Sequence, residues 1–129
     1  MIVVDTSALL AIVLGEEKSD ACIEALQGDT EVLISAGTVA EALIVAARRG
    51  VSGPMETLFE QFDFEIVSVT PASALRIGKA YEQWGKGMHP AGLNFGDCFA
   101  YTLTKEHFCP LLYIGDDFSK TDIKSVLRN

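Results

Sequence analysis

The sequence predicts an α/β fold with a mainly parallel central sheet of four to five strands and helices on both faces. Three observations support this prediction. Four short runs, at 2–4, 31–35, 64–69 and 110–114, have the composition of strands; those at 2–4 and 110–114 are typical of buried strands, and the run at 64–69 alternates between apolar and polar residues. Two stretches with helical spacing of apolar residues separate each run from the next, and glycines or prolines mark most boundaries. Alternation of strands and helices is typical of parallel sheets.

In the first half of the chain the expected elements are a strand at 2–4, helices at 8–14 and 16–26, a strand at 31–35 and a helix at 36–49. The first strand ends at Asp5, and Thr6 or Ser7 can cap the helix that follows. Gly28 and Gly50 are the expected ends of the second and third helices, because glycine tolerates the left-handed backbone that is common after a helix.

In the second half we expect a helix at 54–62, a strand at 64–69, a helix at 72–84, a loop at 85–95, a helix at 97–107, a strand at 110–114 and a further strand at 123–127. Pro54 and Pro71 suit the first turn of a helix. Asn94 is the expected cap of the helix at 97–107. Gly115 is expected to end the strand at 110–114.

Length and composition indicate one domain over 1–129 in the cytoplasm. The 129 residues are 49% hydrophobic and 22% charged, enough for a single core without structural metal or disulfides. The three cysteines are widely spaced, which favours free thiols. The apolar run at 8–14 lacks a preceding basic segment and is much shorter than the ~20 residues that span a bilayer, so no membrane association is expected.

The net charge of −8 argues against binding of nucleic acid by bulk electrostatics, yet it is compatible with a nuclease that gathers carboxylates around a cation. Asp5, Asp116 and Asp117 follow strands, while Glu41 and Asp97 lie near the starts of helices. Strand carboxyl ends and helix amino ends share one edge of a parallel sheet, where ligands bind. We therefore expect these acidic residues to converge there.

Each acidic residue also has a structural explanation. Asp5 can cap a helix, Asp97 suits the positive end of a helix dipole, and an acidic pair after Gly115 is a common turn. Glu41 is harder to explain, because it is the sole charged residue between 36 and 47 and burial of an unpaired carboxylate is costly. A bound cation would be a suitable partner, and oxygen ligands favour Mg²⁺ or Mn²⁺ over zinc.

Four segments of the sequence resemble a known family. They are M-I-V-V-D-T-S-A-L, S-A-G-T-V-A-E-A, H-P-A-G-L-N-F-G-D-C-F-A-Y and L-L-Y-I-G-D-D-F-S-K-T-D-I, and together they extend over essentially the whole chain. They are similar to the VapC toxins of bacterial VapBC toxin–antitoxin pairs, which are PIN-domain ribonucleases. The resemblance implies a PIN-like fold, a metal-dependent endoribonuclease with RNA as substrate, a cognate VapB-like antitoxin and a homodimer.

The resemblance also implies roles for particular residues. Asp5, Glu41 and Asp97 match the first three acidic positions of the PIN site, and Asp5 and Asp97 would be the most direct metal ligands. The fourth position is either Asp116 or Asp117, because relatives often read G-N-D-F where this chain has G-D-D-F. A stretch of small hydroxylated residues follows the first aspartate, so Thr6 and Ser7 are expected in supporting roles.

Three other functions compete with this one. A phosphatase of the haloacid dehalogenase type would have a second aspartate two residues after the first, where this chain has Ser7. A receiver domain would have its acidic pair early, whereas Asp116 and Asp117 come late. A catalytically inactive metal- or RNA-binding module keeps the same residues, and metal-dependent cleavage of RNA would separate it from an enzyme.

Overall fold

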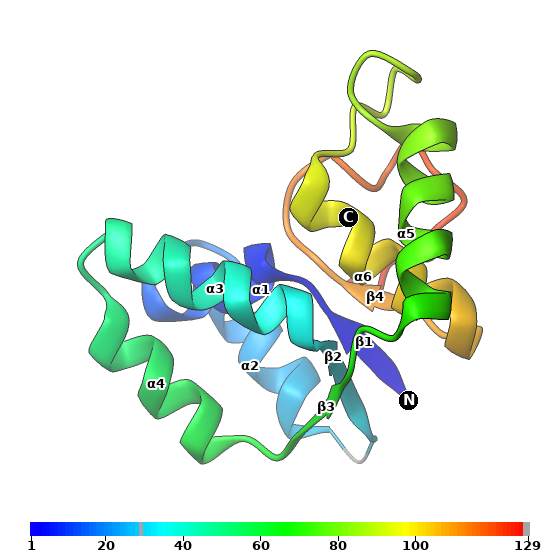
Figure 1. Cartoon of the computed structure of the whole chain (residues 1–129). Coiled ribbons are helices and arrows are strands. Elements are labelled where there is room, and N and C mark those ends of the chain that lie inside the picture. Colours follow the sequence, from blue (N-terminus) through cyan, green and yellow to red (C-terminus); the bar gives the residue numbers. More distant parts are fainter. Residues whose placement is uncertain (29, 128–129) are drawn as a thin grey trace.

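Four parallel strands form the centre of the computed structural model, which describes residues 1–28 and 30–127 (Figure 1). They are β1 (Ile2–Val4), β2 (Val32–Ser35), β3 (Phe64–Val67) and β4 (Leu111–Leu112), in the order β3-β2-β1-β4. Val3 of β1 pairs with Leu33 on one side and Leu111 on the other. The parallel α/β fold expected from the sequence is confirmed.

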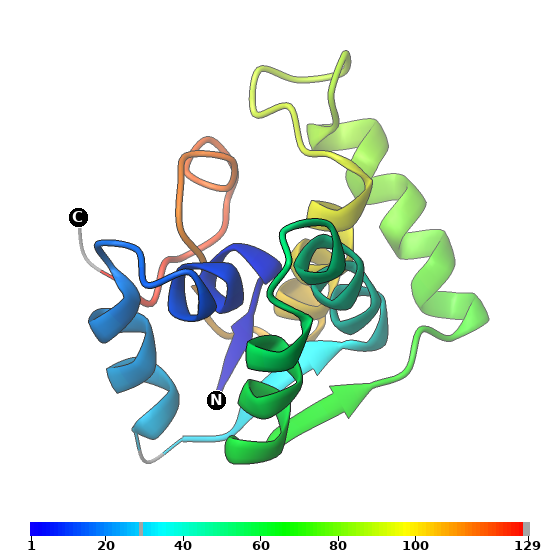
Figure 2. The same ribbon diagram turned by 90° about the vertical axis from the view of Figure 1, so that its left-hand side faces the viewer.

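Two helices precede each strand after the first. They are α1 (Thr6–Val13), α2 (Ser19–Gln27), α3 (Ala36–Arg48), α4 (Ser52–Gln61), α5 (Pro71–Trp84) and α6 (Phe95–His107). Figures 1 and 2 show α1 to α4 together on one side of the sheet and α5 with α6 on the other. Within the described residues no helix is long and apolar enough to cross a membrane.

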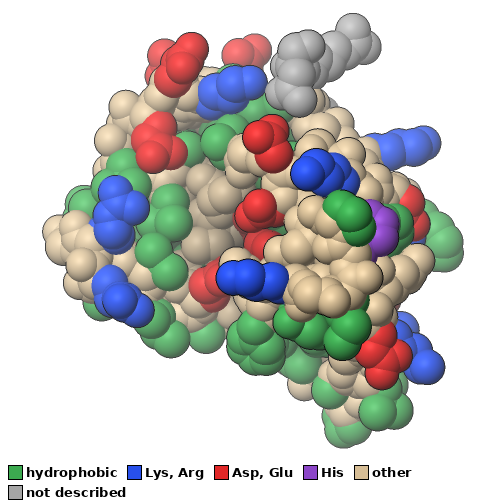
Figure 3. All heavy atoms as spheres, turned by 90° about the horizontal axis from the view of Figure 1, so that it is seen from above, with side chains coloured by type: hydrophobic (Ala, Val, Ile, Leu, Met, Phe, Trp, Pro, Cys, Tyr) green, Lys and Arg blue, Asp and Glu red, His purple; other side chains and the backbone are tan. Residues whose placement is uncertain are grey.

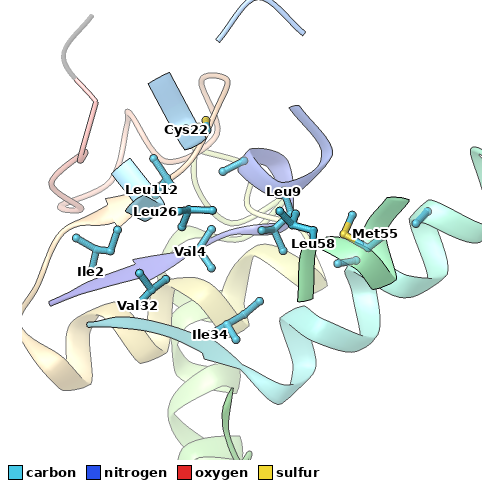
Figure 4. Packing of buried hydrophobic residues seen from close by; sticks show 13 residues of the cluster. Ile2, Val4, Leu9, Cys22, Leu26, Val32, Ile34, Met55, Leu58 and Leu112 are labelled. Atoms are coloured by element: carbon cyan, nitrogen blue, oxygen red, sulfur yellow. The ribbon is translucent and has the colours of Figure 1, made fainter. Parts of the chain in front are cut away.

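Alternating side chains of the strands supply both halves of the core. Val4 of β1 and Ile34 of β2 pack with the helices α1 to α4, in the cluster drawn in Figure 4. The intervening residues Val3 and Leu33 point to the opposite face and pack with α5 and α6. Successive residues of a strand face opposite sides of its sheet, so strands covered on both faces must be apolar throughout. This explains the apolar runs of β1, β2 and β4, whereas the edge strand β3 is only partly buried and includes Glu65.

The prediction of a strand at 123–127 is wrong. In its place a single bridge joins Ser125 to Leu111. Local side-chain bonds compete with a longer ladder here, since the Thr121 hydroxyl accepts from Ile123 N–H and the Ser125 hydroxyl donates to the Leu127 carbonyl. The sheet therefore ends at β4.

Two expectations about helix starts are also corrected. The cap of α1 is Asp5, whose carboxylate accepts a hydrogen bond from Ser7 N–H, and not Thr6 or Ser7. The helix expected at 97–107 begins at Phe95, directly after its predicted cap Asn94. In both cases the capping side chain satisfies an N–H group of the first turn, which has no partner inside the helix.

A close crossing of α3 and α6 brings the two halves of the molecule together. Gly37 lies in the first turn of α3, and a Cβ atom built there would lie 2.6 Å from ring atoms of Phe99 in α6. The absence of a side chain at Gly37 thus lets the two helices approach each other. Of the acidic residues expected at the site, Glu41 lies in α3 and Asp97 in α6.

Replacement of Gly37 by alanine should lower the free energy of unfolding by about 1–3 kcal/mol, because the new methyl group overlaps the Phe99 ring. Gly78 in α5 is the matched control, since nothing lies within 4 Å of a Cβ there. Gly78→Ala should raise the stability by up to about 1 kcal/mol through helix propensity. Urea unfolding of both variants tests this, and equal effects would contradict the proposed close crossing.

Candidate active site

The acidic residues singled out from the sequence lie around the carboxyl edge of the sheet. Asp5 directly follows β1, Glu41 lies in the second turn of α3, Asp97 is in the first turn of α6, and Asp117 follows β4. The charges of Asp5, Asp117 and Glu41 each raise the pKa of Asp97, so the four carboxylates are electrostatic neighbours. Figure 3 views the molecule from above and shows acidic side chains gathered near the middle of this face, with basic side chains around them.

Asp5 is buried and has one oxygen without a partner. Its Oδ2 accepts hydrogen bonds from the Ser7 backbone N–H at 3.1 Å and the Ser7 hydroxyl at 2.7 Å. Its Oδ1 is inaccessible to solvent and has no hydrogen-bond partner within the described part of the chain. The pKa of the carboxyl is raised to about 6, chiefly because burial penalises the charged form and to a lesser extent through Glu41, against the hydrogen bonds from Ser7.

Glu41 is held between two helices. Its Oε1 accepts a hydrogen bond of 2.6 Å from the Thr6 hydroxyl at the start of α1. On the other side it packs on the α6 backbone, because a Cβ atom at Gly96 would overlap its carboxylate. The half-buried Glu41 thus has a hydroxyl partner, which partly explains how this apolar helix accommodates it.

Asp97 is built into the start of α6. Its Oδ2 accepts from Asn94 N–H at 3.0 Å while its own N–H donates to Asn94 Oδ1 at 2.8 Å, which makes a reciprocal capping box. The residue is 7% exposed. Burial raises its pKa to about 7, and three neighbouring carboxylates add to that rise, although the Asn94 bond opposes it. Desolvation therefore outweighs the favourable end of the helix dipole here.

The structure distinguishes the two aspartates after β4. Both are exposed, but only the charge of Asp117 is among the causes that raise the Asp97 pKa. The carbonyl of Asp116 instead accepts hydrogen bonds from Ser119, which closes a turn on the next residues. Phe118 is 2% exposed and packs on Tyr113, so Asp117 is next to a firmly anchored side chain.

Ser7 connects the first and last acidic segments. Its hydroxyl donates to Asp5 Oδ2 and accepts a 3.0 Å hydrogen bond from Ile114 N–H, at the end of the β4 segment. The sequence indicated that Thr6 and Ser7 have supporting roles, but it did not indicate which carboxylate each contacts. Gly96 was missed altogether, and its place between Phe95 and Asp97 gave no signal beyond an expected helix start.

The donor set suits a hard divalent cation. All four site groups are carboxylates, and one buried oxygen of Asp5 lacks a partner. Among residues 1–28 and 30–127, no group of three or more Asp, Glu, His or Cys side chains is arranged so that it could hold a metal ion. Mg²⁺ does not require three direct side-chain ligands, because it keeps several waters and takes one or two direct carboxylates. The residues present therefore fit an ion of this kind.

The sequence matches the family model of the PIN domain over residues 2–124. It is 41% identical to Ribonuclease VapC36 of Mycobacterium tuberculosis over 128 residues, which cover 95% of this chain and 91% of the relative. Ribonuclease VapC30 of the same species is 39% identical over 127 residues, with 96% and 97% covered.

Solved structures share the fold at low identity. Mycobacterium tuberculosis VapC20, described as a Sarcin-Ricin loop cleaving toxin, aligns with a TM-score of 0.77 at 17% identity and covers 98% of both chains. A toxin–antitoxin complex from Klebsiella pneumoniae aligns with a TM-score of 0.71 at 17% identity, covering 95% of this chain and 93% of that one. At this level of identity the likeness shows the architecture alone.

The raised pKa values of Asp5 and Asp97 predict a pH dependence of stability. Each folded-state pKa exceeds the unfolded value near 3.9, so the folded state binds protons more tightly. The resulting stabilisation is complete below about pH 4 and is lost as pH rises through about 6 and 7. Urea unfolding in chelator should therefore give a higher free energy of unfolding at pH 5 than at pH 8.

Asp97→Asn is the control for this dependence. The amide oxygen can still accept the Asn94 bond but the group no longer titrates, so the drop between pH 5 and pH 8 should be smaller in this variant. A drop equal to that of the unmodified protein would contradict the assignment to Asp97.

Proposed function

The chain belongs to the PIN-domain family and, within it, to the VapC ribonucleases, and on that premise we propose that it is a metal-dependent endoribonuclease acting as the toxin of a toxin–antitoxin pair. The observation that carries the proposal is the coupling of Asp97 to the charges of Asp5, Glu41 and Asp117 around the carboxyl edge of the sheet. Carboxylates gathered at this density destabilise a fold unless a cation neutralises them. Hydrolysis of RNA phosphodiester bonds is the reaction that the named relatives support.

Asp5 and Asp97 are the proposed direct ligands of Mg²⁺ or Mn²⁺. Both are buried and both hold one oxygen in a defined hydrogen bond, and the other oxygen of Asp5 is buried with no partner among the described residues. Glu41 and Asp117 would act mainly through water, because Mg²⁺ takes few direct protein ligands. When bound, the ion supplies a more acidic water and neutralises charge on the phosphoryl oxygens.

Thr6 and Ser7 are the proposed positioning residues of this site. The Thr6 hydroxyl fixes one oxygen of Glu41, so that Oε2 is the one left to orient a water. Ser7 fixes Asp5 Oδ2 and, through Ile114, the start of the segment that carries Asp117. Hydrogen bonds that orient ligating carboxylates contribute to metal affinity as well as to structure.

RNA would reach the site across the basic side chains that border it in Figure 3. Arg48 is at the end of α3 and Arg49 follows it, and both are exposed. Arg76 is a weaker candidate, since it forms an ion pair with Glu106 in α6. An acidic protein needs such local positive charge to hold a phosphate backbone.

A cognate VapB-like antitoxin and a second copy of the chain are the proposed partners, and the cytoplasm is the proposed compartment. An arginine from the antitoxin could pair with the site carboxylates and exclude the metal. For the homodimer, candidate contacts are the exposed apolar side chains of α3, β3, α5 and α6 and of the segment between β3 and α5. They include Ile44, Ile66, Val69, Leu75 and Phe95.

Asp97→Asn should reduce RNA cleavage at least ~100-fold while the fold is retained, because the amide cannot supply the charge that a divalent ion requires. Asp20→Asn, which removes an exposed charge from the first turn of α2, should keep full activity. Cleavage of a mixed RNA pool by the purified variants, with circular dichroism to check folding, is the measurement. Turnover by Asp97→Asn at the rate of the unmodified protein in saturating Mg²⁺ would contradict the assignment of Asp97 to the catalytic site.

Asp117→Asn and Asp116→Asn separate the two candidates for the fourth position. Because Asp117 is coupled to Asp97 and the Asp116 carbonyl serves a turn, activity should fall with Asp117→Asn and change little with Asp116→Asn. The same cleavage assay gives the result, and the reverse order of effects would assign the position to Asp116.

Metal should stabilise the folded protein. Binding to the native state alone raises the free energy of unfolding by about 2.7 kcal/mol when the ion is at 100 times Kd. Thermal melts in Mg²⁺ or Mn²⁺ should therefore have a Tm several degrees above that in chelator, and the shift should shrink in Asp97→Asn. Equal midpoints in Mg²⁺ and in Na⁺ of the same ionic strength would leave the metal site unsupported.

A further inference from the structure

The segment 116–124, which follows β4 and carries Asp117, is attached to the fold at its far end and through one buried side chain. The Lys124 carbonyl accepts a hydrogen bond of 2.9 Å from Leu111 N–H, so the chain returns to β4. Between these points the Phe118 ring is 2% exposed. The Asp117 carboxylate is exposed and accepts no hydrogen bond among the described residues. The position of this carboxylate therefore depends on how the segment itself is held.

A chain of hydrogen bonds joins the same segment to α5 and α6. Trp84 Nε1, at the end of α5, donates to the Tyr101 hydroxyl of α6 at 2.8 Å. That hydroxyl donates in turn to Asp122 Oδ1 at 2.8 Å. Burial, and then the bond to Asp122, raise the pKa of Tyr101 to about 12, so the hydroxyl keeps the proton that it donates.

Asp122 differs from the carboxylates of the acidic site, because both of its oxygens have partners. Its Oδ2 pairs with Lys105 Nζ at 2.9 Å, while Oδ1 accepts from Tyr101. Partial burial raises the pKa of Asp122, but the hydrogen bonds from Lys105 and Tyr101 outweigh this effect and the pKa is lowered. Asp122 is thus an ionised acceptor committed to α6, whereas the carboxylate of Asp117 remains free for water or a cation.

The bond between Tyr101 and Asp122 relates two of the site carboxylates to each other. Tyr101 follows Asp97 by four residues in α6, which places both on one face of that helix. Asp122 follows Asp117 by five residues in the segment 116–124. A contact from Tyr101 to Asp122 therefore fixes the segment that carries one acidic group relative to the helix that carries the other.

We propose that Tyr101 and Asp122 are positioning residues, which hold Asp117 near Asp97 so that it orients a water of the bound cation. The inference rests on the proposed function of the acidic site and extends it to residues outside that site. Trp84 fixes the Tyr101 hydroxyl through its N–H group. Hydrogen bonds that orient the groups around a metal typically contribute 10- to 100-fold to its affinity.

Tyr101→Phe tests the proposal, because it removes the hydroxyl and keeps the ring. It should weaken Mn²⁺ binding to the full chain about tenfold, measured as free Mn²⁺ by electron paramagnetic resonance. Thr102→Val is the matched control, since Thr102 is the next residue of α6, is 4% exposed, and has a hydroxyl without a partner among the described residues. It should change the Kd less than about twofold. Equal weakening by both variants would overturn the proposal.

A double-mutant cycle with Asp117→Asn separates positioning from general stability. Tyr101→Phe should cause no further loss of Mn²⁺ affinity when Asp117 is already neutralised, because its effect acts through that carboxylate. Independent, additive losses would show a merely structural role and would overturn the proposal.

Variants of the exposed Asp122 provide the same test without a change in the core. Asp122→Ala should match Tyr101→Phe. Asp122→Asn should restore most of the lost affinity, because the amide oxygen still accepts the Tyr101 bond. Equal losses in Asp122→Ala and Asp122→Asn would contradict a role for this hydrogen bond.

Cleavage of RNA distinguishes this inference from the function on which it rests. In Tyr101→Phe the kcat should fall while the KM for RNA stays the same, because the buried hydroxyl does not face the substrate. The expected Mn²⁺ affinities in a protein that leaves RNA intact would support the positioning role and contradict the proposed ribonuclease. Cleavage by a protein whose Mn²⁺ affinity is unchanged in Tyr101→Phe would overturn the positioning role alone.

Discussion

Burial of carboxylates close to one another at the carboxyl edge of the sheet is the constraint around which the rest of the structure is arranged. Asp5 and Asp97 have been removed from water and placed near Glu41 and Asp117, and their pKa values of about 6 and about 7 express the cost. The protein meets this cost with directed hydrogen bonds. Thr6, Ser7 and Asn94 each donate a hydrogen bond to one oxygen of a different site carboxylate, and none of them contacts the second oxygen of that carboxylate.

The fold makes this arrangement possible through close approach of its two halves. The strands β1, β2 and β4 are short and buried on both faces, so helices cover both sides and their amino ends meet at one edge. Gly37 lets α3 approach the Phe99 ring, and Gly96 leaves room for the Glu41 carboxylate against α6. A side chain at either glycine would separate the helix that carries Glu41 from the helix that carries Asp97. Packing and site geometry are therefore coupled.

The sequence predicted the alternation of elements and the edge on which the acidic residues lie, because both follow from periodicity and from the rules of parallel sheets. It could not predict the contact between Thr6 and Glu41, which are 35 residues apart and meet through tertiary packing. The strand expected at 123–127 fails for a related reason. Its composition suits a strand, but side chains of neighbouring residues compete for its backbone groups.

Asp5 and Asp97 are the two carboxylates that we propose bind the divalent ion directly. A crystal of the full chain soaked in Mn²⁺, with data collected at the manganese absorption edge, tests this most directly. An anomalous peak is expected about 2.1 Å from an oxygen of Asp5 and from one of Asp97, close to the distance at which small octahedral cations bind oxygen. A strong peak at another place, or none at these carboxylates in a protein that cleaves RNA under the same conditions, would contradict it.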